Sequence, residues 1–274
     1  MKLPVSFAAS LHLLALCFFT PTLNAESLTI PHLSDTTKTI EYFLSKPTGK
    51  GPWPTVVFLH GHQDAPRRGA QDFVSWGVLN RWAKRGYLAV AVSQPGYGRS
   101  TGPPDFCGPL TQRAVSAVID KLVSTGDIAK GKVVLEGISR GAIVAGLVAA
   151  ADPSIAGIVL ISGLFDLPQF IAQAKTPAAL RIAQSIRNET GGADQAVAAR
   201  SIARSTAKIN ASVLILNGAL DDRTSPDQAR QLAQQITSRG GKARVIIYPR
   251  YGHQIPVPER DTVIDPFMES VLKR

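Results

Sequence analysis

The chain has 274 residues, 45% of them hydrophobic and 18% charged, and its formal net charge at pH 7 is +10. This size and composition are typical of a globular protein with one α/β domain, and they argue against a disordered or repetitive chain. The positive residues are scattered and do not alternate with stacking aromatic residues, so the sequence does not favour a nucleic-acid-binding protein.

The N-terminal segment predicts an exported protein. Lys2 precedes an apolar stretch from Val5 to Phe19, and small and polar residues then lead to Ala25. A basic start, a short apolar stretch and a small residue at the cleavage point are the parts of a secretory signal peptide, and this stretch is too short for a membrane span. We therefore expect residues 1–25 to be removed and the mature protein, residues 26–274, to be periplasmic or extracellular.

The two cysteines bear on the same segment. The residues before Cys17 weakly resemble a bacterial lipoprotein cleavage box, but Leu16 is bulky where a small residue belongs, so a lipid anchor is a minor alternative. Loss of the signal peptide would leave Cys107 as the only thiol, which excludes an intramolecular disulfide. We expect Cys107 to be a small buried residue.

Strand-like and helix-like segments alternate from residue 54 onward, which favours parallel strands joined by helical crossovers. Strands are expected at 27–32 and 37–44, which lead the sheet as an antiparallel pair, and then at 54–59, 87–92, 132–136, 158–161, 212–217 and 243–248. Helices are expected at 71–86, 111–123, 142–151, 225–239 and 258–272.

One connection is too long for a single crossover helix. Residues 167–206 lie between two expected strands and contain helix-breaking residues at Pro177 and at Gly191-Gly192. We expect this segment to form two or three short helices that make a small cap over the mouth of a pocket.

The pentapeptide Gly137-Ile138-Ser139-Arg140-Gly141 follows an expected strand and precedes an expected helix. In that context, G-x-S-x-G indicates a nucleophile elbow, a sharp turn that exposes a serine hydroxyl above a sheet. Glycines are needed because side chains beside the serine would collide with the neighbouring backbone. Ser139 is therefore the predicted nucleophile.

A serine hydroxyl needs a base to accept its proton. The chain has five histidines, and His253 is the one that lies downstream of Ser139, in a loop after the expected strand 243–248. This position fits the chain order serine, acid, histidine. His253 is therefore the predicted base.

A carboxylate should orient the histidine and stabilise its protonated form. Asp221 follows the apolar strand 212–217 and is the predicted acid, because its place after a strand puts it at the same sheet edge as Ser139 and His253. Asp222 and Asp166 remain alternatives, since each also lies in a turn after an expected strand.

Two backbone N–H groups should form the oxyanion hole, the donor pair that stabilises the tetrahedral intermediate of acyl transfer. The residue after the nucleophile, Arg140, supplies one, and the loop after strand 54–59 supplies the other at His62. The spacing of His60 and His62 also permits a metal site. Only Asp64 lies near to complete such a site, so no metal is expected.

Together these segments resemble the α/β-hydrolase superfamily, and more narrowly the catalytic domains of the prolyl oligopeptidase and dienelactone hydrolase type. The matching pieces lie between residues 54 and 255 in the order that the family has: Phe58–His62, Gln94–Ser100, Gly137–Gly141, Ile215–Arg223 and Tyr251–His253. The resemblance implies an eight-stranded, mostly parallel sheet flanked by helices, with residues 26–274 as one α/β-hydrolase domain. It also implies Ser139, Asp221 and His253 as the triad.

We therefore expect a secreted or periplasmic serine hydrolase that cleaves carboxylic esters or related acyl bonds without a cofactor. Its partner would be a small ester or short peptide substrate, and no membrane span or nucleic acid is expected. A prolyl-oligopeptidase-like peptidase is the alternative, although peptidases of that group usually carry a further N-terminal domain and a glycine pair where this chain has Gly141-Ala142. A non-catalytic binding protein is a third possibility. The excess of positive charge favours acidic substrates, with Arg140 as the expected contact.

Overall fold

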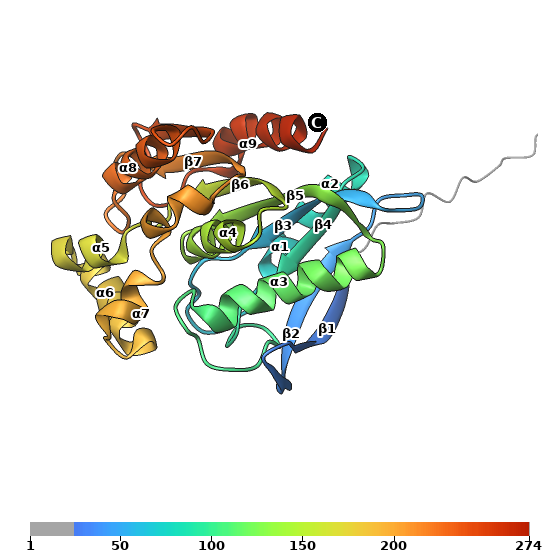
Figure 1. Cartoon of the computed structure of the whole chain (residues 1–274), viewed down its shortest axis with the longest axis horizontal. Helices are drawn as coiled ribbons and strands as arrows, with labels where there is room; N and C mark the ends of the chain where they lie inside the picture. Colours follow the sequence, from blue (N-terminus) through green and yellow to red (C-terminus); the bar gives the residue numbers. More distant parts are fainter. Residues whose placement is uncertain (1–24, 274) are drawn as a thin grey trace, which may run out of the picture.

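Eight strands form one sheet in the order β1-β2-β4-β3-β5-β6-β7-β8 in the computed structural model, which describes residues 25–273 (Figure 1). β1 and β2 are antiparallel to each other, and β2 is antiparallel to β4, whereas the remaining neighbours are parallel. The strands are β1 (Glu26–His32), β2 (Asp35–Ser45), β3 (Trp53–Leu59), β4 (Leu88–Val92), β5 (Ile128–Ile138), β6 (Ile155–Ile161), β7 (Ser212–Gly218) and β8 (Ala243–Tyr248). The expectation of an eight-stranded, mostly parallel sheet is confirmed.

Helices cover both faces of the sheet. α3, α4 and α8 contribute to the hydrophobic core on one face, and α1, α2 and α9 contribute to the core on the other. The central strands are therefore buried on both sides, which is why their sequences are nearly continuous apolar runs. The helices are α1 (Gln71–Ser75), α2 (Val78–Lys84), α3 (Pro109–Ser124), α4 (Arg140–Ala151), α5 (Leu167–Gln173), α6 (Pro177–Thr190), α7 (Asp194–Ala198), α8 (Pro226–Thr237) and α9 (Val257–Leu272).

One predicted helix is interrupted in the structure. The segment 71–86 forms two helices, α1 and α2, rather than one. Gly77 lies between them with a φ of 69°, a left-handed conformation that glycine adopts without strain and that ends a helix. Phe73 of α1 and Leu79 and Trp82 of α2 are buried in the same core, which is why the hydrophobic pattern does not reveal the break.

The predicted cap segment contains three short helices between β6 and β7. Pro177 is the first residue of α6, and Gly191 ends that helix with a φ of 70°, so both breaks lie where the sequence indicated. Figure 1 shows α5, α6 and α7 at one side of the molecule, apart from the helices that cover the sheet.

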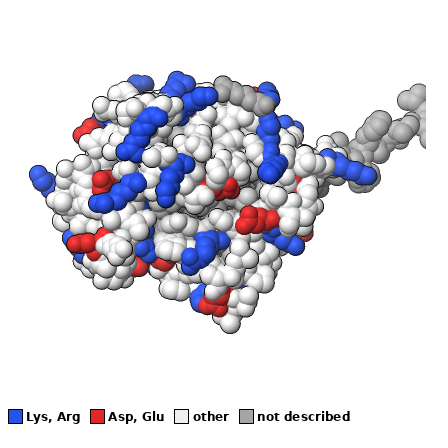
Figure 2. All heavy atoms as spheres, in the orientation of Figure 1, with Lys and Arg blue, Asp and Glu red and all other residues white. Residues whose placement is uncertain are grey.

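The surface reflects the positive net charge. On the face shown in Figure 2, Lys and Arg side chains outnumber Asp and Glu side chains. From residue 25 to residue 273, no helix combines the length and the apolar character that crossing a bilayer requires. The predicted signal peptide and Cys17 lie outside the described residues, apart from Ala25.

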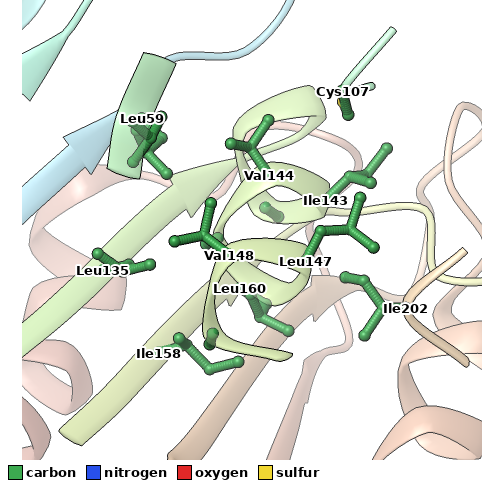
Figure 3. Close-up of a cluster of buried hydrophobic side chains, with 14 of the residues drawn as sticks. Leu59, Cys107, Leu135, Ile143, Val144, Leu147, Val148, Ile158, Leu160 and Ile202 are labelled. Atoms are coloured by element: carbon green, nitrogen blue, oxygen red, sulfur yellow. The ribbon is translucent and has the colours of Figure 1, made fainter. Parts of the chain in front are cut away.

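α4 is the centre of the larger core. Its residues from Arg140 to Ala149 are buried, because the strands β3, β5 and β6 contact the helix together with α3 and residues 202–208. Figure 3 shows this cluster, in which Ile143, Val144, Leu147 and Val148 of α4 lie among side chains of the strands, of the loop before α3 and of the end of the cap segment: Leu59, Cys107, Leu135, Ile158, Leu160 and Ile202. The packing fixes the start of α4, which is where the candidate site lies. Cys107 is buried, as predicted.

Candidate active site

The turn between β5 and α4 has the strained geometry of a nucleophile elbow. Ser139 has φ 55° and ψ −114°, a conformation that non-glycine residues rarely adopt. A Cβ atom on Gly137 would lie 2.1 Å from the carbonyl oxygen of Gly141, and one on Gly141 would lie 2.1 Å from that of Leu59. The glycines of the motif are therefore required by close backbone approach, as the sequence indicated.

His253 lies in the loop between β8 and α9 and contacts Ser139. Its Nε2 is 3.1 Å from the Ser139 Oγ, and its Nδ1 is 3.0 and 3.2 Å from the two carboxylate oxygens of Asp221. A proton on Nδ1 can be donated to the carboxylate, which leaves Nε2 free to accept the serine proton. Three residues far apart in the chain thus form one continuous set of hydrogen bonds.

Asp221 is held firmly by its own turn. Its side chain has no exposed surface and accepts hydrogen bonds from the Thr224 hydroxyl at 2.6 Å and from the Arg223 and Thr224 backbone N–H groups at 2.9 Å. Burial alone would raise the pKa of Asp221. The hydrogen bond and charge of His253, together with the hydrogen bonds of Thr224, hold this pKa below its usual value. The acid is therefore a carboxylate at neutral pH.

The two alternative acids have other contacts. Asp166 accepts the Gln169 N–H at 3.1 Å and so caps the N-terminus of α5. Asp222 is exposed, and its backbone carbonyl accepts the Thr176 hydroxyl. Within residues 25–273, His253 contacts neither of them, so the structure places Asp221 alone in the position of the orienting acid.

The two expected oxyanion donors flank the serine. Arg140 is the first residue of α4, and His62 lies in the loop after β3, where a Cβ on the adjacent Gly61 would be 3.2 Å from the Ser139 Cβ. In the part of the chain that the structure describes, neither the His62 nor the Arg140 backbone N–H donates a hydrogen bond. Both are therefore free to bind a developing oxyanion.

A cavity of about 910 Å³ opens beside these groups. Its wall combines Ser139 and His253 with segments from the loop after β3, the cap helix α6 and the first turn of α9. Phe73, Trp76, Phe106, Ile143, Leu164 and Ile182 supply apolar surface. A pocket of this size, with a few polar groups at one end, is typical of a site for a small ligand.

Family comparisons agree with the fold. Residues 39–179 match the X-Pro dipeptidyl-peptidase (S15) family, and residues 110–265 match the prolyl oligopeptidase family. Each match spans more than half of the chain. The chain belongs to these peptidase families of α/β-hydrolases.

The individual relatives of this chain are distant. Acylamino-acid-releasing enzyme 2 of Oryza sativa subsp. japonica is 24% identical over 236 residues, which are 76% of this chain and 28% of that protein. An acylaminoacyl peptidase structure from Pyrococcus horikoshii has a TM-score of 0.76 at 15% identity. The match covers 93% of this chain and 43% of the peptidase chain. An acetyl xylan esterase from Paenibacillus sp. R4 has a TM-score of 0.71 at 16% identity, covering 94% and 87% of the two chains. The chain thus spans less than half the length of the first two relatives.

The Arg140 side chain has a partner within the protein that the sequence did not indicate. Its guanidinium is only 5% exposed, and it donates to both carboxylate oxygens of Glu189 on α6, at 2.8 and 3.1 Å. The pair neutralises the charge of Arg140 inside the protein. A contact of this residue with an acidic substrate stays a prediction, and such a contact would have to compete with Glu189. Burial disfavours the charged form of Glu189, but the Arg140 charge and hydrogen bonds prevail and lower the pKa of Glu189.

A tyrosine extends this network to the other oxyanion donor. The buried Tyr97 hydroxyl is 3.3 Å from the Arg140 Nη1 and 3.0 Å from the His62 Nδ1. Glu189 also accepts the Phe106 N–H at 2.8 Å, which joins the cap to the loop before α3. The cap, the elbow and the loop after β3 are therefore linked by one set of hydrogen bonds around the nucleophile.

His60 has a structural role. Its Nδ1 lies 2.8 Å from the Gly61 carbonyl and its Nε2 accepts the Gln94 N–H at 3.0 Å, so both ring nitrogens are used. Burial lowers the pKa of His60 to about 4, which keeps the ring neutral. Its nitrogens are not available to a metal, and no cluster of metal-binding side chains occurs between residues 25 and 273.

Sequence reasoning missed three residues around the site. Thr224 could have been found from its spacing to Asp221, because a hydroxyl three residues after an aspartate commonly closes a polar turn. Tyr97 and Glu189 carry no such signal, since they meet Arg140 from positions 43 and 49 residues away.

Proposed function

We propose that this protein is a serine hydrolase that cleaves carboxylic esters or related acyl bonds through an acyl-enzyme, with Ser139, His253 and Asp221 as its catalytic triad. The observation that carries the proposal is the unbroken hydrogen-bond series from the Asp221 carboxylate through His253 to the Ser139 hydroxyl. No cofactor is needed for this chemistry.

The geometry supports a two-step reaction. His253 Nε2 removes the proton of Ser139 as its Oγ attacks the acyl carbon, and the carbonyl electron pair moves onto oxygen, where the His62 and Arg140 N–H groups bind it. The intermediate collapses, the bond to the leaving group breaks, and His253 gives its proton to that group. A water molecule then repeats the sequence on the acyl-enzyme and releases the acid.

Replacement of the nucleophile tests the proposal. Ser139→Ala should abolish labelling by a fluorophosphonate probe and lower p-nitrophenyl acetate turnover by on the order of 10⁶-fold. The matched control is Ser238→Ala, which removes an exposed hydroxyl after α8 and should leave both readouts unchanged. Labelling or turnover that survives Ser139→Ala would refute the proposed triad.

Peptide cleavage is the second candidate, because both matching families are peptidases. Ester cleavage is supported by the acetyl xylan esterase, whose chain is covered over 87% of its length without a further large domain. The two candidates separate in a panel of p-nitrophenyl esters and peptide p-nitroanilides with equal acyl groups. A higher kcat/KM on the esters, beyond their greater intrinsic reactivity, supports an esterase, and the reverse supports a peptidase.

We also propose that the protein is exported and cleaved after Ala25, on the strength of the N-terminal sequence pattern. The N-terminus of the protein recovered from periplasm or medium should be Glu26. A lipid-modified Cys17 at the N-terminus would support the anchored alternative. Recovery of an uncleaved protein from the cytoplasm would contradict export.

A further inference from the structure

Four arginines line the cavity beside Ser139, and one of them, Arg140, is paired with Glu189. The other three come from three separate segments. Arg181 comes from the cap helix α6, Arg223 from the turn that holds Asp221, and Arg260 from the first turn of α9. The pocket wall thus collects positive charge that the linear sequence shows only as scattered residues.

The protein itself leaves these charges largely unpaired. Within residues 25–273, the side chains of Arg181 and Arg223 form neither a salt bridge nor a hydrogen bond, in contrast to Arg140 with its Glu189 partner. Both side chains are exposed, and water solvates an exposed guanidinium without a protein partner. Arg260 therefore says more about what the cavity binds.

The Arg260 side chain is only 11% exposed, and its Nε is buried without a hydrogen-bond partner. The nearest carboxylate is that of Asp261, at 4.0 Å, and Asp261 is already engaged with Arg81 at 2.5 Å. A buried cation without a hydrogen-bonded counter-charge is unfavourable in a folded protein. The Nη1 and Nη2 groups of Arg260 are not fully buried and form no hydrogen bond within residues 25–273, so a ligand carboxylate in the cavity can bind the guanidinium there.

Acidic groups near the cavity do not balance these arginines. Asp72 pairs with Arg68 and accepts the Gln63 side-chain amide, and Asp64 is fully exposed. Glu136 is the buried acid that senses the charge of Arg260, but burial raises the pKa of Glu136 to about 7, so it is only partly ionised at neutral pH. The wall therefore keeps a net positive charge.

We propose that this cavity selects acyl substrates that carry a carboxylate, with Arg260 as the main binding cation and Arg181 and Arg223 at the mouth. The inference rests on the proposed hydrolase function of the same site. The carboxylate can belong to the acyl group, as in a half-ester of a dicarboxylic acid, or to the leaving group, as at the C-terminus of a short peptide. Both present the same anion to the same three guanidinium groups.

Matched substrates test the proposal and separate the two sources. For the acyl side, the mono-p-nitrophenyl ester of adipic acid is compared with p-nitrophenyl hexanoate, which has an acyl chain of equal length without the carboxylate. For the leaving-group side, N-acetyl-dialanine is compared with its C-terminal amide. In at least one pair, kcat/KM for the anionic substrate should exceed that for the neutral one by about tenfold or more.

The preference should depend on the arginines of the wall. Arg260→Gln should lower the ratio of the two kcat/KM values by about tenfold, and Arg181→Gln and Arg223→Gln by about two- to threefold each, because exposed charges are screened. Arg187→Gln is the control, since Arg187 is exposed on the same helix α6 but is not part of the cavity wall. The ratio compares two substrates on one enzyme preparation, so partial loss of folded protein does not affect it.

Two results would overturn the inference: no anionic preference in either pair, or a fall in the ratio for Arg187→Gln as large as that for Arg260→Gln, which would indicate only a long-range effect of net charge. Either result would leave ester turnover by the wild type and its loss in Ser139→Ala intact. Failure of the proposed function is distinguishable, because turnover of both substrates would then persist in Ser139→Ala.

Discussion

The carboxylate of Asp221 has more restraints than any other group of the proposed triad. It accepts hydrogen bonds from Thr224, from two backbone N–H groups and from His253, while its neighbour Asp222 is exposed. The turn therefore presents one of two adjacent carboxylates to the histidine and turns the other to solvent.

This arrangement predicts different outcomes for the two aspartates. Asp221→Asn should lower kcat for p-nitrophenyl acetate by about 10⁴-fold, because an amide in this place no longer holds the tautomer with the proton on Nδ1 or stabilises the protonated histidine. Asp222→Asn serves as the matched control and should keep kcat within about twofold. Steady-state kinetics measure both, and a larger loss in Asp222→Asn than in Asp221→Asn would show that the acid is misassigned.

Most residues of the candidate site could be predicted from the sequence. Ser139, Asp221 and His253 could be predicted because each follows a strand, and the ends of parallel strands meet at one edge of a sheet. The contact of Arg140 could not be predicted, since its partner Glu189 lies on the cap helix and no periodicity in the sequence relates the two.

The helix α6 is joined to the predicted nucleophile elbow by a buried ion pair. Arg140 is 5% exposed and Glu189 is 16% exposed, and Ser185 of the same helix donates a further hydrogen bond to Glu189 at 2.9 Å. A pair in this environment is strongly coupled, because removal of one member leaves the other charge buried.

Replacing one member of the pair should therefore destabilise the fold more than replacing both members with apolar residues. Glu189→Gln should lower the free energy of unfolding by about 3 kcal/mol, whereas the double variant Arg140→Met/Glu189→Leu should lie within about 1 kcal/mol of the wild type. Urea denaturation provides the values, and Glu259→Gln, at an exposed position of α9, is the control expected to change little. Equal destabilisation by the single and double variants would show that the ion pair is not the source of the effect.

The elements themselves were largely predictable, and the exception is instructive. The strand at 243–248 has the predicted bounds, because an apolar, β-branched run leaves few alternatives. The break at Gly77 was not predicted, since a single glycine is tolerated within many helices and only its observed φ of 69° shows that it ends one. A local break of this kind depends on how the two helices pack on the sheet, which the pattern of apolar residues does not encode.

For the whole molecule, the two faces of the sheet differ in how they are held. The face covered by α3, α4 and α8 is apolar, whereas α2 and α9 on the opposite face are also joined by ion pairs of Arg81 with Asp261 and of Arg85 with Asp265. Glu136 of β5 lies beneath these helices and is 6% exposed. Its carboxyl is sensitive to the charges of Arg260, Asp261, Arg81 and Asp265, but burial has the largest effect on its pKa.

This buried carboxyl predicts a fall in stability with rising pH. Burial raises the pKa of Glu136 from 4.5 to about 7. Below about pH 4.5 the group is protonated in both states. Between about pH 4.5 and 7 the unfolded chain releases a proton that the folded chain keeps, so the free energy of unfolding falls by about 3 kcal/mol in total. Glu136→Gln, which is uncharged at every pH, should lack this loss.

The variant should therefore gain stability over the wild type as the pH rises from about 5 to about 8, when both are unfolded in urea at each pH. The difference between the two proteins is the informative quantity, because groups with lowered pKa values, such as Asp221 and Glu189, change with the pH equally in both. Glu259→Gln provides the comparison for loss of an exposed carboxylate on α9. Parallel stability curves for the wild type and Glu136→Gln would mean that the charged form of Glu136 is already compensated, and Arg260 would be its partner rather than a free cation of the cavity wall.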